Sequence, residues 1–109
     1  MTQTPEQRLE ALDLLLPCIV IPAGNLLGFK IDSDQIFVSS QLPLEDGPVK
    51  YVGKVGEAVS NESAYEAAKL AALNVISQLS LATEGDLSKV ADIVKLPGFV
   101  NCVPDFRVW

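Results

Sequence analysis

The sequence predicts a single α+β domain, and three features of its 109 residues predict it. A capped helix opens the chain, a hairpin of short strands follows, and a long amphipathic helix occupies the second half. A chain of this length suits one domain. Hydrophobic residues make up 49% and charged residues 20%, the balance of a packed domain. The expected order of elements is αβββαβ, without an internal repeat.

The first expected helix spans residues 4–16. Thr4 suits the N-cap, Pro5 suits the first helical position, and Gln7 stands where a capping box needs Glu or Gln. Leucines then recur three and four positions apart, and Pro17 ends the pattern. We expect this helix to pack at the edge of the domain.

Short strands are expected in the part of the chain that follows. Residues 18–22 are apolar but bounded by prolines, so we expect an edge segment or an extended linker there. The polar stretch from Asp32 to Gln35 separates two apolar pairs and predicts a β-hairpin. The pairs are Phe29 with Ile31 and Ile36 with Val38. A second turn at residues 45–48 leads to a third short strand, at Val49, Tyr51 and Val52.

The clearest predicted element is a long helix that begins at Ser60 or Asn61. Small and apolar residues repeat along it at the i, i+3, i+4, i+7 spacing of one helix face. They are Ala64, Ala67, Ala68, Ala71, Ala72, Val75, Ile76 and Leu79. Because alanine allows close approach, we expect this face to lie tightly across the sheet. A helix that binds a partner protein is the alternative.

The chain after this helix is expected to turn and return to the sheet. Gly85 lies in the stretch that ends the helix. A further turn is expected at residues 87–90, and a fourth strand at Ile93, Val94 and Leu96. Gly53 and Gly56, before the helix, lack the spacing of a phosphate-binding loop and are expected to serve backbone turns.

Composition excludes several classes of function. The net charge is −6, with 8 basic and 14 acidic residues, which disfavours nucleic acids and anionic membranes as partners. The chain has no histidine, which excludes Ser-His and Cys-His catalysis within one chain and removes the commonest metal ligand. Cys18 and Cys102 are far apart in the sequence, and we expect free thiols, with a disulfide as the open alternative. Without a signal peptide or a long apolar run, a soluble cytoplasmic protein is expected.

Five stretches of the sequence together indicate a family: QIFVSSQLPL, YVGKVGE, EAAKLAALNVISQL, GDLSKV and VKLPGFVN. In this order they closely resemble the Rid family of reactive-intermediate deaminases, also called YjgF or endoribonuclease L-PSP-like proteins. The resemblance extends from Asn25 to Phe106. It implies a chorismate-mutase-like α+β fold with an antiparallel-rich sheet and helices packed on one face. It also implies a homotrimer with ligand sites in clefts between subunits.

The resemblance further implies hydrolysis of enamine and imine acids of the 2-aminoacrylate type to 2-oxo acids and ammonia, without a cofactor or metal. Ser39 matches the serine of the family's VSGQ strand, and Asn101 matches the asparagine of its FVN segment, so both are expected to bind substrate. Gln41 is expected to be structural. Ser40 replaces the family's glycine, a change that can crowd the cleft floor. Two alternatives to the binding role remain open: Ser39 can be an ordinary strand residue, and Asn101 can be a turn residue.

The chain departs from the family pattern after Phe106. The family continues with an arginine that holds the substrate carboxylate and a glutamate that positions water. Neither has a match here, and Arg107 does not correspond to that arginine. We therefore expect one Rid-like domain over residues 1–109, shortened at its C-terminus, with its sheet and long helix at residues 25–106. No catalytic residue is assigned, and the alternative is a non-catalytic, oligomerising remnant that binds a small ligand or a partner.

Overall fold

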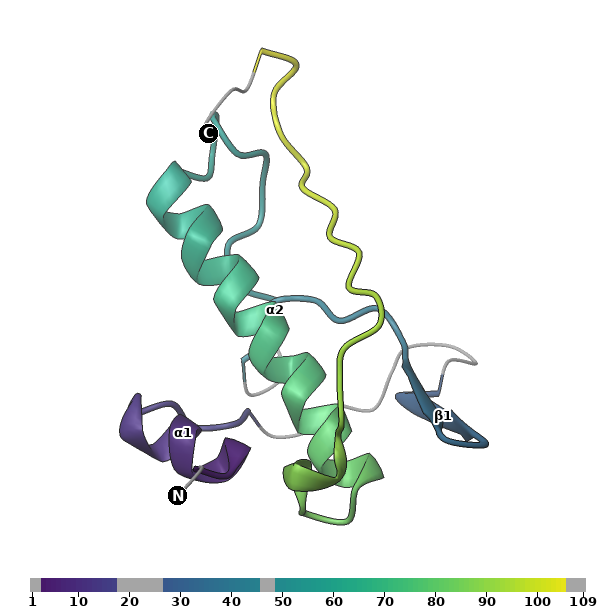
Figure 1. The fold of residues 1–109 in the computed structure, drawn as a ribbon. Coiled ribbons are helices and arrows are strands. Elements are labelled where there is room, and N and C mark those ends of the chain that lie inside the picture. The colour runs from purple at the N-terminus through teal and green to yellow at the C-terminus, as the bar shows by residue number, and fades with distance from the viewer. Residues whose placement is uncertain (1–2, 18–26, 46–48, 106–109) are drawn as a thin grey trace.

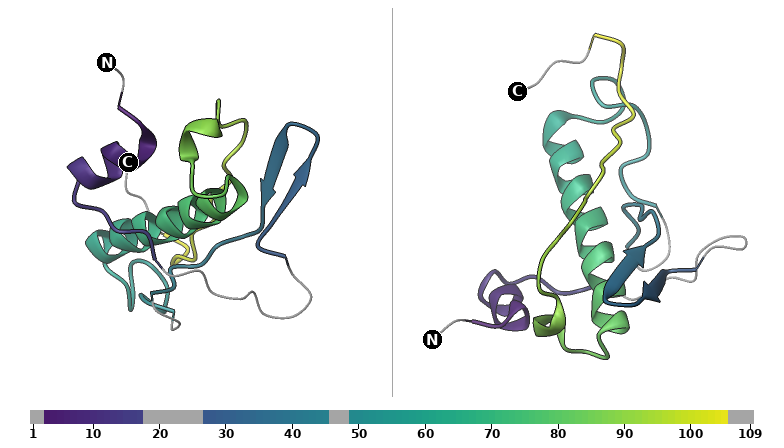
Figure 2. Two further views of the ribbon diagram at one scale, coloured as in Figure 1. Left: turned by 90° about the horizontal axis from the view of Figure 1, so that it is seen from below. Right: turned by 45° about the vertical axis from the view of Figure 1, so that its right-hand side comes forward.

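The computed structural model describes residues 3–17, 27–45 and 49–105. Its elements are α1 (Pro5–Ala11), β1 (Phe29–Asp32), β2 (Gln35–Val38), α2 (Asn61–Ala82) and the 3-10 helix η1 (Leu87–Lys89). Figure 1 shows α2 as the axis of the molecule, with α1 and the hairpin of β1 and β2 on either side of its C-terminal end. Beyond η1 the chain runs back beside α2, as Figure 1 and the right view of Figure 2 both show.

The start of α1 confirms the predicted capping box. The hydroxyl of Thr4 accepts a hydrogen bond from the backbone N–H of Gln7 at 3.1 Å. The side-chain carbonyl of Gln7 accepts one from the backbone N–H of Thr4 at 2.9 Å. These two bonds satisfy backbone donors that have no partner within the helix.

The end of α1 differs from the predicted range of 4–16, because the helix stops at Ala11. Asp13 adopts a left-handed φ of 57°. Its N–H donates to the carbonyl of Glu10 at 3.0 Å, and the N–H of Leu14 donates to the carbonyl of Leu9 at 2.9 Å. This pair of bonds is a Schellman motif, which caps the last carbonyls and turns the chain out of the helix.

The predicted hairpin is confirmed. β1 and β2 pair antiparallel, with Phe29 opposite Val38 and Asp32 opposite Gln35. Ser33 has a φ of 57°, as a tight connection between twisted strands requires.

The third and fourth strands were predicted wrongly. Residues 49–52 form no strand, and only an isolated bridge joins Val49 to Leu44. Tyr51 has a φ of 59°, a left-handed conformation that a strand cannot accommodate. Residues 93–96 also form no strand, because no segment of the described chain lies beside them as a hydrogen-bonding neighbour. The predicted edge segment at residues 18–22 and most of the turn at 45–48 lie outside the described residues.

The turns before α2 hold part of the small core. Gly53 and Gly56 have φ values of 133° and 93°, which confirms their role in backbone turns. The N–H of Val59 donates to the carbonyl of Lys54 at 3.1 Å, and the N–H of Gly56 donates to the carbonyl of Val59 at 2.8 Å. These bonds close the loop around Val55 and Val59, which are 6% and 5% exposed. Leu87 is the other buried hydrophobic residue in the described part of the chain.

Both ends of α2 follow the predicted pattern. The hydroxyl of Ser60 caps the first turn by accepting from the N–H of Ser63 at 3.1 Å. At the other end Glu84, and not glycine, takes the first left-handed position after the cap, with a φ of 56°. Gly85 follows, and its N–H donates to the carbonyl of Ser80 at 2.8 Å, which again forms a Schellman motif.

The buried face of α2 is polar, and the predicted alanine face is only partly covered. Ala68 and Ala72 are exposed. The residues buried most deeply on the helix are Asn74, Ser77 and Gln78. Apolar periodicity therefore did not identify the face that α2 turns toward the rest of the chain.

These buried polar side chains serve segments without regular structure. The Asn74 amide donates to the carbonyl of Leu42 at 3.0 Å and to that of Leu44 at 2.9 Å. The Ser77 hydroxyl donates to the carbonyl of Pro17 at 3.0 Å. Buried carbonyls outside helices and sheets need such donors. The three bonds fix the chain on both sides of the hairpin to one face of α2.

Gly28 lets the hairpin approach α2 closely. A Cβ at Gly28 would lie 2.4 Å from the side-chain oxygen of Gln78 and 2.9 Å from its Cδ. Gln78 is 3% exposed. The absence of a side chain at Gly28 is therefore what allows Gln78 to be buried beneath the start of β1.

The first helix docks on the 3-10 helix at the end of α2. The Glu6 carboxylate accepts a hydrogen bond from the backbone N–H of Leu87 at 2.7 Å. Asp86 caps η1, accepting from the N–H of Ser88 at 3.1 Å and from its hydroxyl. The hydrogen bond from the Ser88 hydroxyl is the largest cause that lowers the pKa of Asp86 below its ordinary value of 3.8. The bond from the Ser88 N–H and the charge of Lys89 lower this pKa further.

We predict that Asn74→Ala destabilises the protein by about 1–3 kcal/mol, because the carbonyls of Leu42 and Leu44 both lose the Asn74 amide, and Leu42 keeps only the N–H of Leu44. Chemical denaturation followed by circular dichroism measures this change. Asn61→Ala, at an exposed position on the same helix, is the matched control and should change the free energy of unfolding by less than about 0.5 kcal/mol. Equal effects of the two substitutions would contradict the role of Asn74.

We predict that Gly28→Ala costs about 1–3 kcal/mol of stability, because the new methyl group overlaps the Gln78 side chain. In a Gln78→Ala background the same change should cost less, since the overlapping atoms are gone. A double-mutant cycle on the free energy of unfolding measures the difference. Additive effects would show that the two residues do not meet.

The Asp86 cap predicts a pH dependence. Because the folded pKa lies below the unfolded value, the cap stabilises the protein above pH 3.8 and is lost as the pH falls through the lower folded pKa. An NMR titration of the Asp86 carboxyl carbon should give a value below 3.8, and Ser88→Ala should raise it. A wild-type value at or above 3.8 would refute the capping contact.

Candidate functional site

Ser39, the first expected binding residue, follows β2 and is half-buried. Its N–H and its hydroxyl both donate to the carbonyl of Gly28, at 3.0 and 3.2 Å. The Gln41 amide donates to the Ser39 carbonyl at 3.0 Å and to its hydroxyl oxygen at 3.3 Å. Gln41 thus holds Ser39 in place. To donate a hydrogen bond to a ligand, the Ser39 hydroxyl would have to release Gly28.

Asn101, the second expected binding residue, lies near the end of the described chain with its side chain exposed. Its backbone carbonyl accepts from the N–H of Val55 at 2.9 Å. The N–H of Val103 donates to the carbonyl of Val55 at 3.0 Å, which makes a parallel bridge between Val55 and Cys102. The backbone at Asn101 is therefore fixed, and its amide is free to point toward solvent or a ligand.

One chain does not bring Ser39 and Asn101 together. Ser39 is bonded to Gly28, which abuts Gln78 near the C-terminal end of α2. Asn101 is bonded to Val55, which lies just before the N-terminal end. Gln78 lies 17 residues after the start of α2 at Asn61, a rise of about 26 Å along the helix, so the two residues lie near opposite ends of α2. Within one described chain the two residues therefore do not line a common site.

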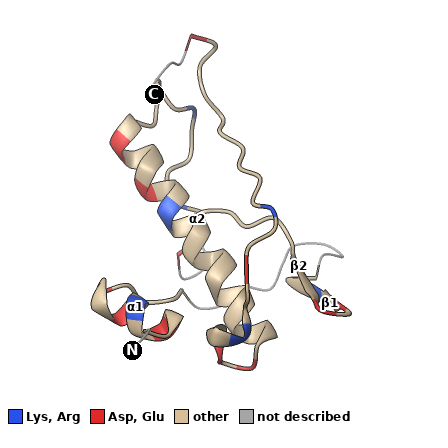
Figure 3. Ribbon diagram, in the orientation of Figure 1, with Lys and Arg blue, Asp and Glu red and all other residues tan. Residues whose placement is uncertain are grey.

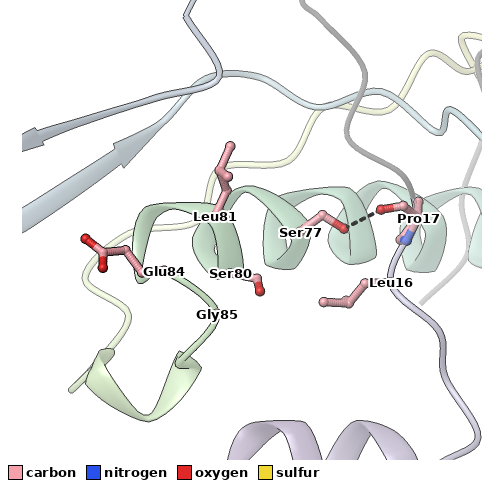
Figure 4. Close-up of a pocket in the computed structure, with 7 residues that line it drawn as sticks. All are labelled: Leu16, Pro17, Ser77, Ser80, Leu81, Glu84 and Gly85. Carbon is pink, nitrogen blue, oxygen red and sulfur yellow. Dashed lines mark hydrogen bonds between the residues drawn. The ribbon is translucent and has the colours of Figure 1, made fainter.

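A cavity of about 380 Å³ lies beside the C-terminal half of α2 and contains neither expected residue (Figure 4). Its lining residues are Leu16, Pro17, Ser77, Ser80, Leu81, Glu84 and Gly85. The Ser77 hydroxyl is bonded to the Pro17 carbonyl, and the Glu84 carboxylate points away from Pro17 and Leu16. Polar groups do not converge in this cavity, so it offers no arrangement for acid–base chemistry.

A second cavity, of about 260 Å³, lies between α1, the C-terminal part of α2 and the segment 87–90 that contains η1. It is lined mainly by the apolar side chains of Leu9, Leu12, Ile76, Leu79 and Leu87. Arg8 contributes the charged group of the lining. This cavity is the space that remains because the side chains of these helices do not pack completely.

Charges are scattered over the described surface. Figure 3 shows single lysines and arginines on separate elements, with acidic residues between them. Within residues 3–17, 27–45 and 49–105, no group of three or more Cys, Asp or Glu side chains could hold a metal ion. In the same residues no helix combines the length and the apolar character needed to cross a bilayer.

Sequence analysis did not predict the contact between Gly28 and Gln78. This contact positions the segment that carries Ser39. The available signal was that Asn74, Ser77 and Gln78 share one face in the apolar C-terminal half of the helix. Buried amides on such a helix indicate that irregular backbone packs against it.

Comparison with known proteins identifies relatives over most of the chain. Residues 6–105 match a family model described as "YjgF/chorismate mutase-like, putative endoribonuclease". Protein TCP17 of Trypanosoma cruzi is 37% identical over 98 residues, which are 90% of this chain and 61% of that protein.

Two crystal structures are similar in fold and sequence. Atu1372 of Agrobacterium tumefaciens, a protein with unknown function, has a TM-score of 0.82 and 41% identity. The match covers 94% of this chain and 60% of that chain. A protein described as a "putative endoribonuclease", from Shewanella oneidensis MR-1, has a TM-score of 0.74 and 38% identity over 79% of this chain and 56% of its own.

The chain thus spans about three fifths of the length of these relatives. The family resemblance of the five sequence stretches and the α+β fold that it implied are both confirmed. The chain belongs to the YjgF/chorismate mutase-like family.

Proposed function

We propose that this chain forms part of a Rid-type enzyme that hydrolyses enamine and imine acids to 2-oxo acids and ammonia. The observation that carries the proposal is the family match over residues 6–105, with Ser39 and Asn101 at the positions of the family's motifs. The enamine tautomerises to the imine, and water adds to the imine carbon to give a carbinolamine. The carbon–nitrogen bond of the carbinolamine then breaks, the oxygen of the water stays in the 2-oxo acid, and both of its protons leave on ammonia. No cofactor is needed for this reaction.

The residues of this chain supply the neutral polar half of such a site. The exposed amide of Asn101 can both donate and accept, and the Ser39 oxygen can accept. A substrate carboxylate also needs a cation, and a guanidinium binds it through two hydrogen bonds. The family's arginine and glutamate have no match in these 109 residues. We propose that both groups belong to the part of the domain that the longer relatives have in addition.

The placement of the two residues supports a site between subunits. Because Ser39 and Asn101 lie at opposite ends of α2, a cleft lined by both takes Ser39 from one subunit and Asn101 from its neighbour. A ring of subunits joined in this way, such as a homotrimer, repeats the same cleft at every contact. We propose this arrangement for the assembled protein, in the cytoplasm.

Cleavage of RNA, the activity in the name of one relative, has less support in this chain. The net charge is −6, and the chain contains no histidine to act as general base or acid. The basic residues of the described surface form no stripe along which a phosphate backbone could lie (Figure 3).

A second candidate function is non-catalytic binding of a small ligand or a partner by an oligomer. The observation that favours it is the lack of a match for the family's arginine and glutamate. Under this alternative Ser39 and Asn101 would bind a ligand without turning it over.

We predict that a chimera, in which the part of Atu1372 beyond the matched region follows Asp105, releases ammonia from freshly generated 2-aminoacrylate. Its rate should exceed that of the 109-residue chain at least about tenfold, because under the proposal the added part supplies the carboxylate clamp. Asn101→Ala and Ser39→Ala in the chimera should lower kcat/KM about 5- to 100-fold each, the effect of one lost hydrogen bond to the reacting molecule.

Asn61→Ala in the same chimera is the control and should leave the rate unchanged, since Asn61 is exposed in the first turn of α2. A folded chimera with no ammonia release above buffer would refute the deaminase proposal and leave the binding alternative. Full activity of the 109-residue chain would refute the statement that it holds only half of a site.

A further inference from the structure

A chain of hydrogen bonds fixes the direction of the Ser39 hydroxyl. Ser39, Gln41 and Gly28 are all half-buried. The Gln41 amide donates to the Ser39 hydroxyl oxygen at 3.3 Å, and the Ser39 hydroxyl donates to the Gly28 carbonyl at 3.2 Å. Each bond joins two described residues, so none of them depends on the part of the domain that the longer relatives have in addition.

The Gln41 side chain can only donate to Ser39. Its amide nitrogen lies 3.0 Å from the backbone carbonyl oxygen of Ser39, which can only accept. If the amide were turned over, its own oxygen would face that carbonyl oxygen, and two acceptors would repel each other. The same nitrogen lies against the hydroxyl oxygen, so this bond also runs from Gln41 to Ser39.

The Gly28 carbonyl receives the hydroxyl proton. A carbonyl oxygen cannot donate, so the proton of this bond comes from Ser39. The same carbonyl accepts from the Ser39 N–H at 3.0 Å. Its place is fixed, because Gly28 lies so close to the buried Gln78 side chain that a Cβ would overlap it. The hydroxyl therefore gives its proton to another group only by breaking a bond.

One lone pair of the Ser39 hydroxyl is left for a ligand. A serine hydroxyl has one donor and two acceptor lone pairs. Gly28 takes the donor, and Gln41 takes one lone pair. The other lone pair accepts a bond from an N–H or O–H group. It repels a carbonyl or carboxylate oxygen that approaches from the same side.

We propose that Gln41 is a positioning residue that holds Ser39 as a hydrogen-bond acceptor, so that Ser39 binds the nitrogen of the ligand and not its carboxylate. The identity of that nitrogen rests on the proposed function, in which it is the N–H group of the imine or enamine acid. The substrate carboxylate then lies away from Ser39, on the side of the cation.

An acceptor at this place distinguishes the substrate from the product. An imine group and a keto group have nearly the same size, but the imine nitrogen carries hydrogen and the keto oxygen does not. Ser39 therefore binds the imine acid and repels the 2-oxo acid that replaces it. A bond from the protonated imine also favours the charged form, whose carbon water attacks more readily.

Oxamate and pyruvate test the proposal on the 109-residue chain. Both are stable, planar monoanions with the same number of non-hydrogen atoms, and only oxamate carries N–H donors. NMR titrations followed at the Ser39 N–H and at the Gln41 side-chain amide measure the two dissociation constants. In the wild type oxamate should bind at least about tenfold more tightly, the effect of one hydrogen bond. Ser39→Ala should reduce this preference to less than about threefold.

Gln41→Met separates positioning from a structural role. Methionine has a similar length and no donor, so the Ser39 hydroxyl is free to turn toward a ligand, and the preference for oxamate should fall below about threefold. A purely structural Gln41 would weaken both anions by one factor and leave their ratio unchanged. Gln41→Lys keeps a donor and should restore the preference. Gln35→Met, at an exposed glutamine of the same hairpin, is the matched control and should leave it intact.

Equal binding of the two anions by the wild type, tighter binding of pyruvate, or no saturable binding of either up to about 100 mM would overturn the proposal. A preference that survives Gln41→Met unchanged would overturn it too. Ammonia release by the chimera is a separate readout. An active chimera without the oxamate preference leaves the deamination standing and refutes the roles of Ser39 and Gln41. The preference together with an inactive chimera supports these roles and refutes only the deamination.

Discussion

The amide of Asn74 holds two carbonyls of the chain that leaves the hairpin, and the rest of the structure depends on this contact. It donates to Leu42 and Leu44 from the middle of α2, where its exposure is 6%. One turn further on, Gln78 lies beneath Gly28 at the start of the hairpin. The hairpin is thus fixed at its entry and at its exit by polar side chains of one helix face. This is unusual for a small domain, in which apolar burial normally supplies that fixation.

The polar face of α2 also decides where candidate binding residues lie. The position of Ser39 is set by its hydrogen bond to the Gly28 carbonyl, and the position of Gly28 is set by its contact with Gln78. Asn101 is placed through Val55 in the loop before α2. Since most of α2 lies between these anchors, a single chain holds the two candidate residues apart. The proposed function and the expected cleft between subunits both start from this separation.

Local features could be predicted from the sequence, and features that need distant partners could not. The Thr4 capping box, the hairpin turn at Ser33 and the end of α2 depend on neighbouring residues and were predicted. The strand expected at Ile93, Val94 and Leu96 needs another strand beside it, which the described chain does not supply. The polar face of α2 was not predicted, because the groups that it binds are backbone carbonyls of loops. Backbone carbonyls leave no pattern in the sequence. Ser39 and Asn101 came from family motifs, and their binding role stays a prediction.

Hydrogen exchange measured by mass spectrometry tests the role of the α2 polar face most directly. In the wild type, the amides of Leu44 and Lys50 are bonded to carbonyls of Leu42 and Pro43, and they should be protected. In Asn74→Ala this protection should fall at least about tenfold at Leu44 and Lys50, while the amides of α2 keep theirs. If the loop keeps full protection without the Asn74 amide, the polar face does not hold the hairpin, and the account of this fold is wrong.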